Sequence, residues 1–267
     1  MKEPLCVLTI AGSDSGAGAG VQADARVIHA LGGYALTAIT AVTAQNTIGV
    51  TAWQPMDPEL IVAQISAVME DFRVGAIKTG LLPSAAAVRA VAKELGRYKK
   101  RPPLVVDPVV ASTSGEEFLS LAGVKALRWN LLSLAQLVTP NWPEAEILSG
   151  RPVRTDAGAE AAGRRILETG VGAVLVKGGH GGGDTCRDCL LVAGQETQWF
   201  SSPRLITQNT HGTGCVLSAA IATGLARGSK LPVAIAYAQR LLSRSLRRQR
   251  GQVWGSGRGP AFPGISD

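Results

Sequence analysis

A glycine-spaced polar stretch, residues 207–215, runs directly into an apolar, alanine-rich segment at 216–222. This pattern predicts a loop followed by a buried helix. The first N–H groups of a helix have no intrahelical partner, and together with the helix dipole they favour an anion such as phosphate. Gly212 and Gly214 allow the main chain to approach that anion closely. Cys215 falls in the first helical turn, where the same field favours thiolate over thiol. The alternative is a glycine-containing N-cap with a small buried cysteine.

Other polar side chains follow predicted strands, and ligands of open α/β sheets bind beyond the carboxyl ends of the strands. Asp107 ends one strand, and Lys177 stands before a Gly-Gly turn after another. Asn141 and Glu144 are three residues apart at a helix start, so they share one face. Oxygen ligands beside phosphates are typical of Mg²⁺ sites, usually through retained water. A lysine over a glycine turn suits a nucleotide phosphate. Each of these features alone is also compatible with ordinary helix capping.

The glycine-rich stretch 12–20 offers Gly16, Gly18 and Gly20 after the first predicted strand. A dinucleotide-binding fingerprint also requires an acidic residue at the end of the second strand, to hold the ribose. That strand ends at 43–46 without a carboxylate, which disfavours a nicotinamide dehydrogenase. We interpret the glycines as letting the chain close over a small substrate, which Asp24 faces from one turn into the following helix.

Short buried strands alternate with segments of helical period along the whole chain, which predicts an α/β fold with a parallel sheet and helices on both faces. Strands are predicted at 5–11, 34–43, 49–54, 76–79, 104–107, 136–139, 173–177, 189–192 and 196–200, the last two as a hairpin. Helices are predicted at 21–31, 58–72, 84–95, 119–134, 141–148, 155–168, 214–226 and 232–248. The chain has no linker or repeat. We therefore expect residues 1–267 to form one domain, with a Gly/Pro-rich C-terminal tail at 251–267.

Composition excludes several classes of protein. The 267 residues are 46% hydrophobic and 18% charged, which indicates a globular chain with a substantial core. The net charge of +7 permits an anionic ligand. Much of the excess lies in five arginines between Arg240 and Arg250, at the end of the last predicted helix, and no aromatic side chain is interleaved among them as a nucleic-acid reader requires. We therefore expect no nucleic-acid partner.

Cysteine usage and hydropathy also limit where the protein works. Four cysteines in a chain this long do not form a disulfide framework, and Cys186 and Cys189 lack the second pair of a zinc site. No span approaches the roughly 20 apolar residues that a membrane helix requires. We expect a cytoplasmic protein with no membrane partner.

The motifs of the chain, in order, are AGSDS at 11–15, GAGVQAD at 18–24, AQNT at 44–47, KTGLL at 78–82, VDPV at 106–109, TPN at 139–141, EAE at 144–146, KGGH at 177–180 and NTHGTGC at 209–215. In this order they resemble the motifs of the ribokinase superfamily and, within it, those of the bacterial hydroxymethylpyrimidine/phosphomethylpyrimidine kinases of thiamine biosynthesis. The resemblance covers about residues 5–225. One such motif would be a weak signal, whereas the set in register is a specific one.

The resemblance implies a ribokinase-like sheet, ATP with Mg²⁺ as phosphoryl donor, a homodimer and a small-molecule acceptor, an aminopyrimidine alcohol and its phosphate. It places Gln45 on the pyrimidine, and a glutamine side chain offers both a donor and an acceptor to the ring edge. We assign the substrate side to Gln45, Asp24, Gly12, Leu81 and Val109. Leu81 stands where the family usually has methionine.

The catalytic role falls to the stretch described first. We expect the amides of Gly212, Thr213, Gly214 and Cys215 to hold the transferring phosphoryl group. Cys215 occupies the position that is an aspartate base in most sugar and nucleoside members of the superfamily. As a thiolate it would accept the proton of the substrate CH₂OH group.

The nucleotide and its metal fall to the residues that follow the central strands. We assign Lys177, Asp107 and Thr210 to ATP, and Asn141 and Glu144 to Mg²⁺ through water.

Alternatives remain open. The nearest is a pyridoxal or pyridoxine kinase of the same superfamily, since pyridoxal is a ring of similar size that carries a CH₂OH group. From another class, a non-catalytic nucleotide-binding module would keep the fold without turnover. The family's Gly-His-Gly-Pro near the C-terminus appears here as residues 257–260, with Arg258 in place of histidine.

Overall fold

The computed structural model describes residues 3–111, 116–262 and 264. Nine strands form one sheet in the order β3-β2-β1-β4-β5-β6-β7-β8-β9. The strands are β1 (Cys6–Asp14), β2 (Tyr34–Gln45), β3 (Val50–Pro55), β4 (Val74–Thr79), β5 (Leu104–Val106), β6 (Leu137–Val138), β7 (Ala173–Val176), β8 (Thr185–Val192) and β9 (Gln198–Pro203). The block from β2 to β7 is parallel, whereas β3, β8 and β9 pair antiparallel at the margins.

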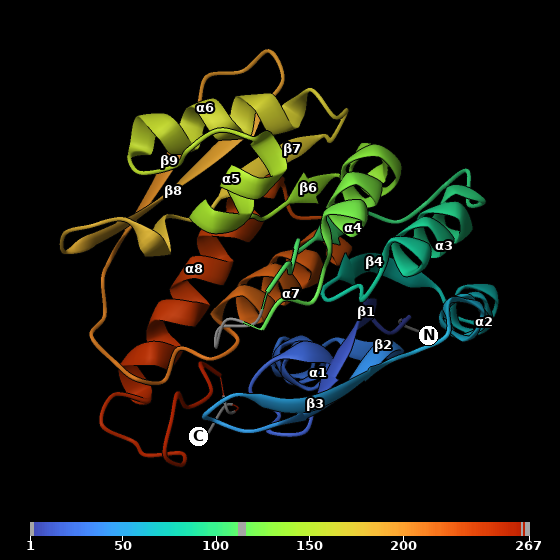
Figure 1. The fold of residues 1–267 in the computed structure, drawn as a ribbon, viewed down its shortest axis with the longest axis horizontal. Helices are drawn as coiled ribbons and strands as arrows, with labels where there is room; N and C mark the ends of the chain where they lie inside the picture. Colours follow the sequence, from blue (N-terminus) through green and yellow to red (C-terminus); the bar gives the residue numbers. More distant parts are fainter. Residues whose placement is uncertain (1–2, 112–115, 263, 265–267) are drawn as a thin grey trace.

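Helices cover both faces of this sheet (Figure 1). The helices are α1 (Gly20–Ala30), α2 (Pro58–Asp71), α3 (Ala85–Gly96), α4 (Leu121–Ala126), α5 (Trp142–Ser149), α6 (Asp156–Leu167), α7 (Thr213–Ala226) and α8 (Leu231–Arg248). One apolar core lies between the sheet and α2 to α6, and a second lies between the sheet and α1, α7 and α8. The predicted fold class, a mostly parallel ribokinase-like sheet with helices on both faces, is confirmed.

Helix α7 is the most enclosed of these helices, and its sequence explains why. Residues 216–223 are all buried, including Ser218 and Thr223, so the helix is covered on all sides. The hydroxyl groups of Ser218 and Thr223 donate to main-chain carbonyls one turn earlier, at Gly214 and Ala219, which satisfies them without water. The helix is therefore enclosed by protein along its length, and its N-terminus lies at the carboxyl ends of the central strands.

The segment at 119–134 differs from the single helix that its period predicts. It forms α4, then a π-helical turn at Leu127–Leu131 and a 3₁₀ turn at Leu132–Leu134. Leu131 and Leu132 are both completely buried. Both irregular turns are short, as is usual for π and 3₁₀ segments within or at the end of a helix.

The C-terminal segment after α8 is packed against the body of the protein rather than free. Ala261 and Phe262 are buried in the α1, α7 and α8 core. The amide of Ala261 donates to the carbonyl of His211 at 2.8 Å. The Gly/Pro-rich C-terminal tail predicted at 251–267 is thus anchored to the core at Ala261 and Phe262, while 263 and 265–267 lie outside the described residues.

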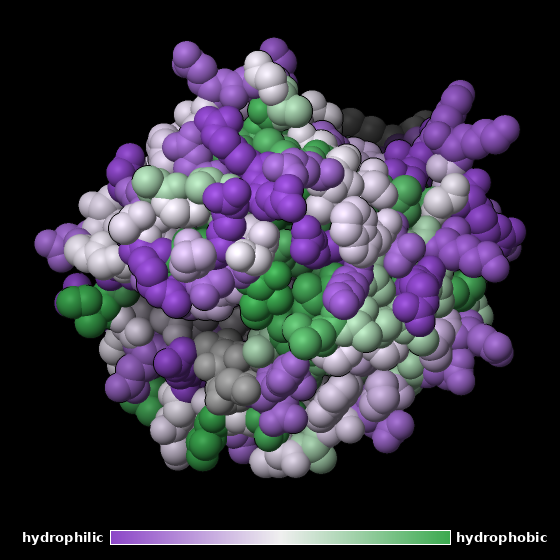
Figure 2. Space-filling model, turned by 45° about the horizontal axis from the view of Figure 1, so that its top comes forward, coloured by the Kyte–Doolittle hydropathy of each residue, from purple (hydrophilic) through white to green (hydrophobic). Residues whose placement is uncertain are grey.

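The exposed face in Figure 2 carries many hydrophilic side chains around an apolar area. Within the described ranges, no helix combines the length and hydropathy needed to cross a bilayer.

Candidate active site

A pocket of about 770 Å³ lies at the carboxyl ends of the central strands, where the N-terminus of α7 meets the sheet. This volume is in the range of small-molecule and cofactor sites. Every residue assigned to the site from the sequence lines it, except Asp24: the set is Gly12, Gln45, Leu81, Asp107, Val109, Asn141, Glu144, Lys177, Thr210, Gly212, Thr213, Gly214 and Cys215. The pocket therefore brings together segments from the whole length of the chain.

The N-terminus of α7 presents main-chain donors to this pocket. The N-cap, Gly212, has a φ of 80°, and a Cβ there would lie 1.9 Å from the carbonyl oxygen of Gly18. Only glycine fits. Among the described residues, the amides of Gly212, Gly214 and Cys215 have no protein acceptor, and that of Thr213 makes one long bond of 3.4 Å to Thr210. These free donors at a helix N-terminus suit a phosphate group.

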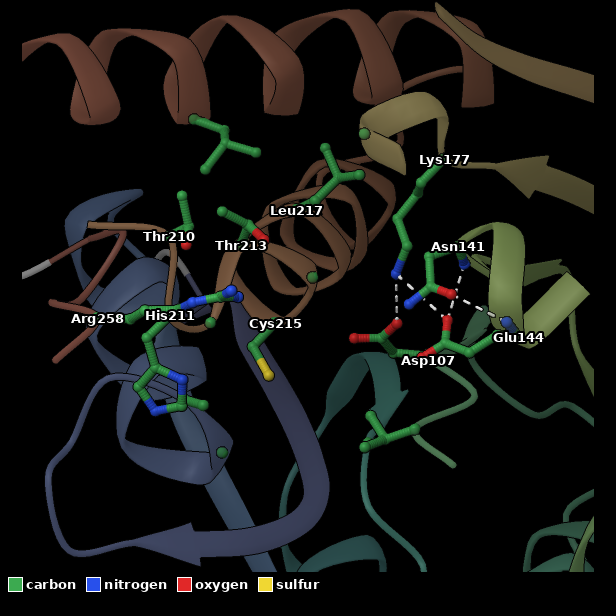
Figure 3. A pocket seen from close by; sticks show the side chains of 18 of the residues that line it. Asp107, Asn141, Glu144, Lys177, Thr210, His211, Thr213, Cys215, Leu217 and Arg258 are labelled. Carbon is green, nitrogen blue, oxygen red and sulfur yellow. Dashed lines mark hydrogen bonds and ion pairs between the residues drawn. The ribbon is translucent and has the colours of Figure 1, made fainter. Parts of the chain in front are cut away.

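Cys215 is half-buried on the wall of the pocket (Figure 3). Burial raises the pKa of its thiol to about 11, although the ammonium group of Lys78 acts in the opposite direction. The carboxyl groups of Asp24 and Asp107 raise the pKa further. The expectation that the helix N-terminus favours a resident thiolate is therefore wrong, because desolvation outweighs the groups that favour the thiolate, Lys78 and a backbone hydrogen bond from Gly20.

Three charged side chains meet on the other side of the helix N-terminus (Figure 3). The Lys177 Nζ atom lies 2.9 Å from Asp107 Oδ1 and 3.9 Å from Glu144 Oε2. Burial acts to raise the pKa of Asp107, but Lys177 and Lys78 outweigh it and lower that pKa. Burial raises the pKa of Glu144 to about 7 despite the attraction of Lys177. The ammonium group of Lys177 thus lies between the ionised carboxylate of Asp107 and the carboxyl group of Glu144, which titrates near neutrality.

Asn141 and Glu144 form a capping box at the start of α5. The Asn141 side chain accepts from the amide of Glu144 at 2.9 Å, and the Glu144 carboxylate accepts from the amide of Asn141 at 2.7 Å. Asn141 and Glu144 thus cap the helix, which was the alternative to a ligand-binding role, and both side chains also line the pocket. One oxygen of each side chain is already used.

The side-chain oxygen atoms of Asp107 and Glu144 suit a Mg²⁺ ion that is bound partly through water. In the part of the chain that the structure describes, no group of three His, Cys, Asp or Glu side chains is placed to hold a metal ion. Asp107 and Glu144 remain as carboxylates on the pocket wall. Mg²⁺ usually keeps several waters and binds one or two carboxylates plus substrate phosphates. The residues present suit such a water-mediated site and not a closed protein cage.

Asp24 does not lie where the sequence places it. It is completely buried, and its Oδ2 atom accepts from Lys78 Nζ at 2.7 Å and from Thr9 Oγ1 at 2.5 Å. Its Oδ1 atom has no hydrogen-bond partner. Asp24 thus lies behind Lys78, which itself lines the pocket. The assignment of Asp24 to direct substrate contact is replaced by one in which it holds Lys78.

The pocket also contains ionisable residues that the sequence analysis did not assign to it, and three of them are Lys78, Asp14 and His211. The His211 Nε2 atom lies 2.8 Å from Asp14 Oδ2, and the side-chain amide of Gln45 contacts the same ring nitrogen at 3.1 Å. A Cβ on Gly18 would lie 2.2 Å from the His211 ring. Asp14, Lys78 and His211 belong to the AGSDS, KTGLL and NTHGTGC motifs, in which other residues were assigned to the site. Their membership of these motifs could have identified them.

Comparison with known proteins identifies a family and several relatives of this chain. Residues 14–261 match the family model described as phosphomethylpyrimidine kinase. The hydroxymethylpyrimidine/phosphomethylpyrimidine kinase of Rhizobium meliloti is 45% identical over 254 residues, which cover 95% of this chain and 94% of the relative. A thiamine biosynthesis bifunctional protein of Geobacter sulfurreducens is 43% identical over 255 residues, and this chain spans about half of it, 51%.

A solved structure shows the same fold over nearly the whole chain. An ADP complex of Bacillus subtilis pyridoxal kinase superposes with a TM-score of 0.87 at 31% identity, over 96% of this chain and 97% of that one. Similarity in sequence and in fold thus extends over nearly the whole chain, including the α7 N-terminus and the pocket around it. This chain belongs to the phosphomethylpyrimidine kinase family.

Proposed function

We propose that the protein is an ATP-dependent kinase of thiamine biosynthesis. It phosphorylates the CH₂OH group of 4-amino-5-hydroxymethyl-2-methylpyrimidine and then converts the monophosphate to the diphosphate. The observation that carries this proposal is the set of unpaired amides at Gly212, Gly214 and Cys215, which face the same pocket as Gln45 and Lys177. The name of the Rhizobium meliloti relative supports this choice of substrate.

Phosphoryl transfer depends mainly on positioning and on stabilising charge. The α7 amides hold the transferring group from one side. Lys177, kept protonated between Asp107 and Glu144, neutralises nucleotide phosphate charge from the other side. Mg²⁺, when bound through water at Asn141 and Glu144, would add positive charge at the phosphates. Thr210 lies beside the amides and completes the nucleotide contacts.

The acceptor binds against Gln45, Gly12, Leu81 and Val109, which line the same pocket. Gln45 presents both a donor and an acceptor to the edge of an aminopyrimidine. Because the side-chain amide of Gln45 contacts His211, which in turn contacts Asp14, these two residues set the orientation of Gln45.

Cys215 accepts the proton of the alcohol in the first transfer. With a thiol pKa of about 11, only about one molecule in ten thousand carries the thiolate at pH 7. The first transfer must therefore speed up as the pH rises. The second transfer needs no base, since an oxygen of the monophosphate is already ionised.

A pyridoxal kinase is the second candidate, and the similarity to the Bacillus subtilis enzyme favours it. A non-catalytic binding module is disfavoured, because a relative that matches 95% of this chain is named as a kinase.

A coupled assay of ADP formation decides between the candidates. It compares hydroxymethylpyrimidine, its monophosphate and pyridoxal at equal concentrations of ATP. We expect turnover of both pyrimidines with a kcat/KM at least about tenfold above that for pyridoxal, a modest ratio for differential binding of two rings. A reversed ratio supports the pyridoxal kinase, and no ADP formation with any acceptor supports the binding module.

We also propose that the protein works in the cytoplasm as a homodimer. Light scattering on the eluted protein measures its mass against the 27.7 kDa of one chain.

A further inference from the structure

Arg258 enters the pocket from the C-terminal segment, and the main chain around it is held firmly on the side of Gln45. The amide of Arg258 donates to the carbonyl of Thr47 at 2.8 Å, and the amide of Gly257 donates to the Thr47 hydroxyl at 3.1 Å. Thr47 lies two residues after Gln45. The segment therefore lies next to the loop that carries the acceptor-binding glutamine.

A second set of contacts holds the other side of the same segment. The amide of His211 donates to the carbonyl of Gly259 at 3.0 Å. The Asn209 side chain is buried and donates to the carbonyls of Gln249 and Gln252 at 2.6 and 3.0 Å. Arg258 is thus fixed between the acceptor loop and the loop that leads into α7.

The guanidinium group has no charge partner among the described residues. Arg258 is exposed and lines the pocket, and no ion pair or side-chain hydrogen bond involves it. The Asp14 carboxylate is paired with His211, and Asp107 on the far side of the pocket is paired with Lys177. Figure 3 shows Arg258 directed toward Thr213 and Cys215, on the side of the α7 N-terminus opposite Lys177. The pocket therefore has a surplus cation at its acceptor end.

We propose that Arg258 binds the phosphate group of the phosphomonoester acceptor in the second transfer, an inference that rests on the proposed function. The free alcohol is neutral at this point, whereas a phosphomonoester carries about two negative charges at neutral pH. A guanidinium group recognises such a group with two parallel hydrogen bonds. Arg258 thus distinguishes the second substrate from the first.

The chemistry of that step balances without an added reagent. An ionised oxygen of the monophosphate forms a bond to the γ-phosphorus of ATP. The bond from that phosphorus to the oxygen bridging the β- and γ-phosphates breaks, and ADP leaves with the electron pair. Arg258 holds the attacking phosphate in place, and no proton has to be removed from the acceptor.

The test compares the full-length protein with Arg258→Gln, Arg258→Lys and Arg250→Gln in steady-state assays of both transfers. Arg250 is an exposed arginine outside the pocket lining, so its variant controls for the loss of one charge. We expect Arg258→Gln to raise the KM for the monophosphate roughly 10- to 100-fold, the size of a lost charge-assisted pair. The KM for the alcohol changes much less, Arg258→Lys falls between, and Arg250→Gln matches the wild type.

Other outcomes overturn the proposal. A rise in the KM for ATP in both transfers assigns Arg258 to the terminal phosphate of the nucleotide instead. Equal losses for both acceptors, or no change, remove any role in recognising the second substrate. If the wild type phosphorylates neither pyrimidine, the proposed function fails. In that case, calorimetric titration with the monophosphate tests Arg258 separately. If Arg258→Gln binds the monophosphate as tightly as the wild type, Arg258 does not bind its phosphate group.

Discussion

At Cys215 two physical effects oppose each other. Lys78 and a backbone hydrogen bond from Gly20 stabilise the thiolate, while burial and the carboxyl groups of Asp24 and Asp107 stabilise the thiol. Burial dominates, and the pKa rises to about 11. The sequence reveals the position of the cysteine in the first turn but not its desolvation, because desolvation depends on segments that pack over it from elsewhere in the chain.

Alkylation kinetics test this raised pKa. The thiolate is the reactive form, so the rate of iodoacetamide labelling at Cys215 should rise about tenfold per pH unit from pH 6.5 to 9.5 without levelling off. Peptide mass spectrometry separates Cys215 from Cys186, the other half-buried cysteine of the pocket. The urea-unfolded protein is the control and should show an inflection near the ordinary value of about 8.5. A plateau near pH 7 in the folded protein would contradict a thiol that is protonated at rest.

The two transfers differ in their need for a base, and Cys215→Ala separates the roles of this residue. We expect kcat for the alcohol to fall by about 10²- to 10⁴-fold, the usual size of a lost general base. The monophosphate reaction should lose less than about tenfold, because its attacking oxygen is already ionised. Quench-flow of each transfer measures both values.

Cys215→Ser serves as the matched variant, since it keeps size but has a much less acidic group. Equal losses in the two transfers would instead assign Cys215 to the α7 phosphate site and remove its role as a base.

At the scale of elements, the Asp24–Lys78 pair connects α1 to the adjacent strands. Both side chains are fully buried, and Thr9 on β1 donates to the same carboxylate. Removing one partner of a buried pair leaves an uncompensated charge, which costs about 3–5 kcal/mol. Lys78→Met should therefore lower the free energy of unfolding by that amount, measured by urea titration.

The double variant Asp24→Asn with Lys78→Met is the control for this pair. It removes both charges and keeps an acceptor for Thr9. We expect it to recover most of the lost stability while remaining impaired in catalysis, since Lys78 also acts on Cys215. A single variant as stable as the wild type would show that the pair contributes nothing to the fold.

Element positions follow from local pattern much better than side-chain directions do. Ser84 caps α3 and Gly150 ends α5 in the left-handed region, as propensity and capping rules predict. The predicted direction of Asp24 was wrong because a carboxylate in a first turn is equally compatible with the pocket and with the core. Only the buried lysine on a neighbouring strand decides between them, and strand order cannot be read from period alone. Likewise, Cys186 and Cys189 lie three apart on β8, where they point to opposite faces of the strand.

At the scale of the whole molecule, the pocket depends on contacts between the two ends of the chain. His211 joins Asp14 near the N-terminus to Pro260 near the C-terminus, through a side-chain contact and a main-chain bridge. The motifs allowed the phosphate-binding end to be predicted, because a loop and its helix are adjacent in sequence. The closing of residues 257–262 over the acceptor end could not be predicted, since Gly/Pro-rich composition is typical of free tails and of tightly packed segments alike.

A pair of glycine variants tests whether this segment shapes the acceptor site. A Cβ on Gly259 would lie 2.0 Å from Asn209 Oδ1. Asn209 cannot move away without losing its bonds to Gln249 and Gln252, so the segment itself must shift. Gly259→Ala should therefore raise the KM for the monophosphate by about tenfold or more, as a displaced charge-assisted contact implies, and it should speed amide exchange at 251–262. Gly182→Ala is the matched control, because Gly182 is exposed with nothing within 4 Å of its Cβ position. If the two variants behave alike, the C-terminal segment covers the acceptor end without helping to build it.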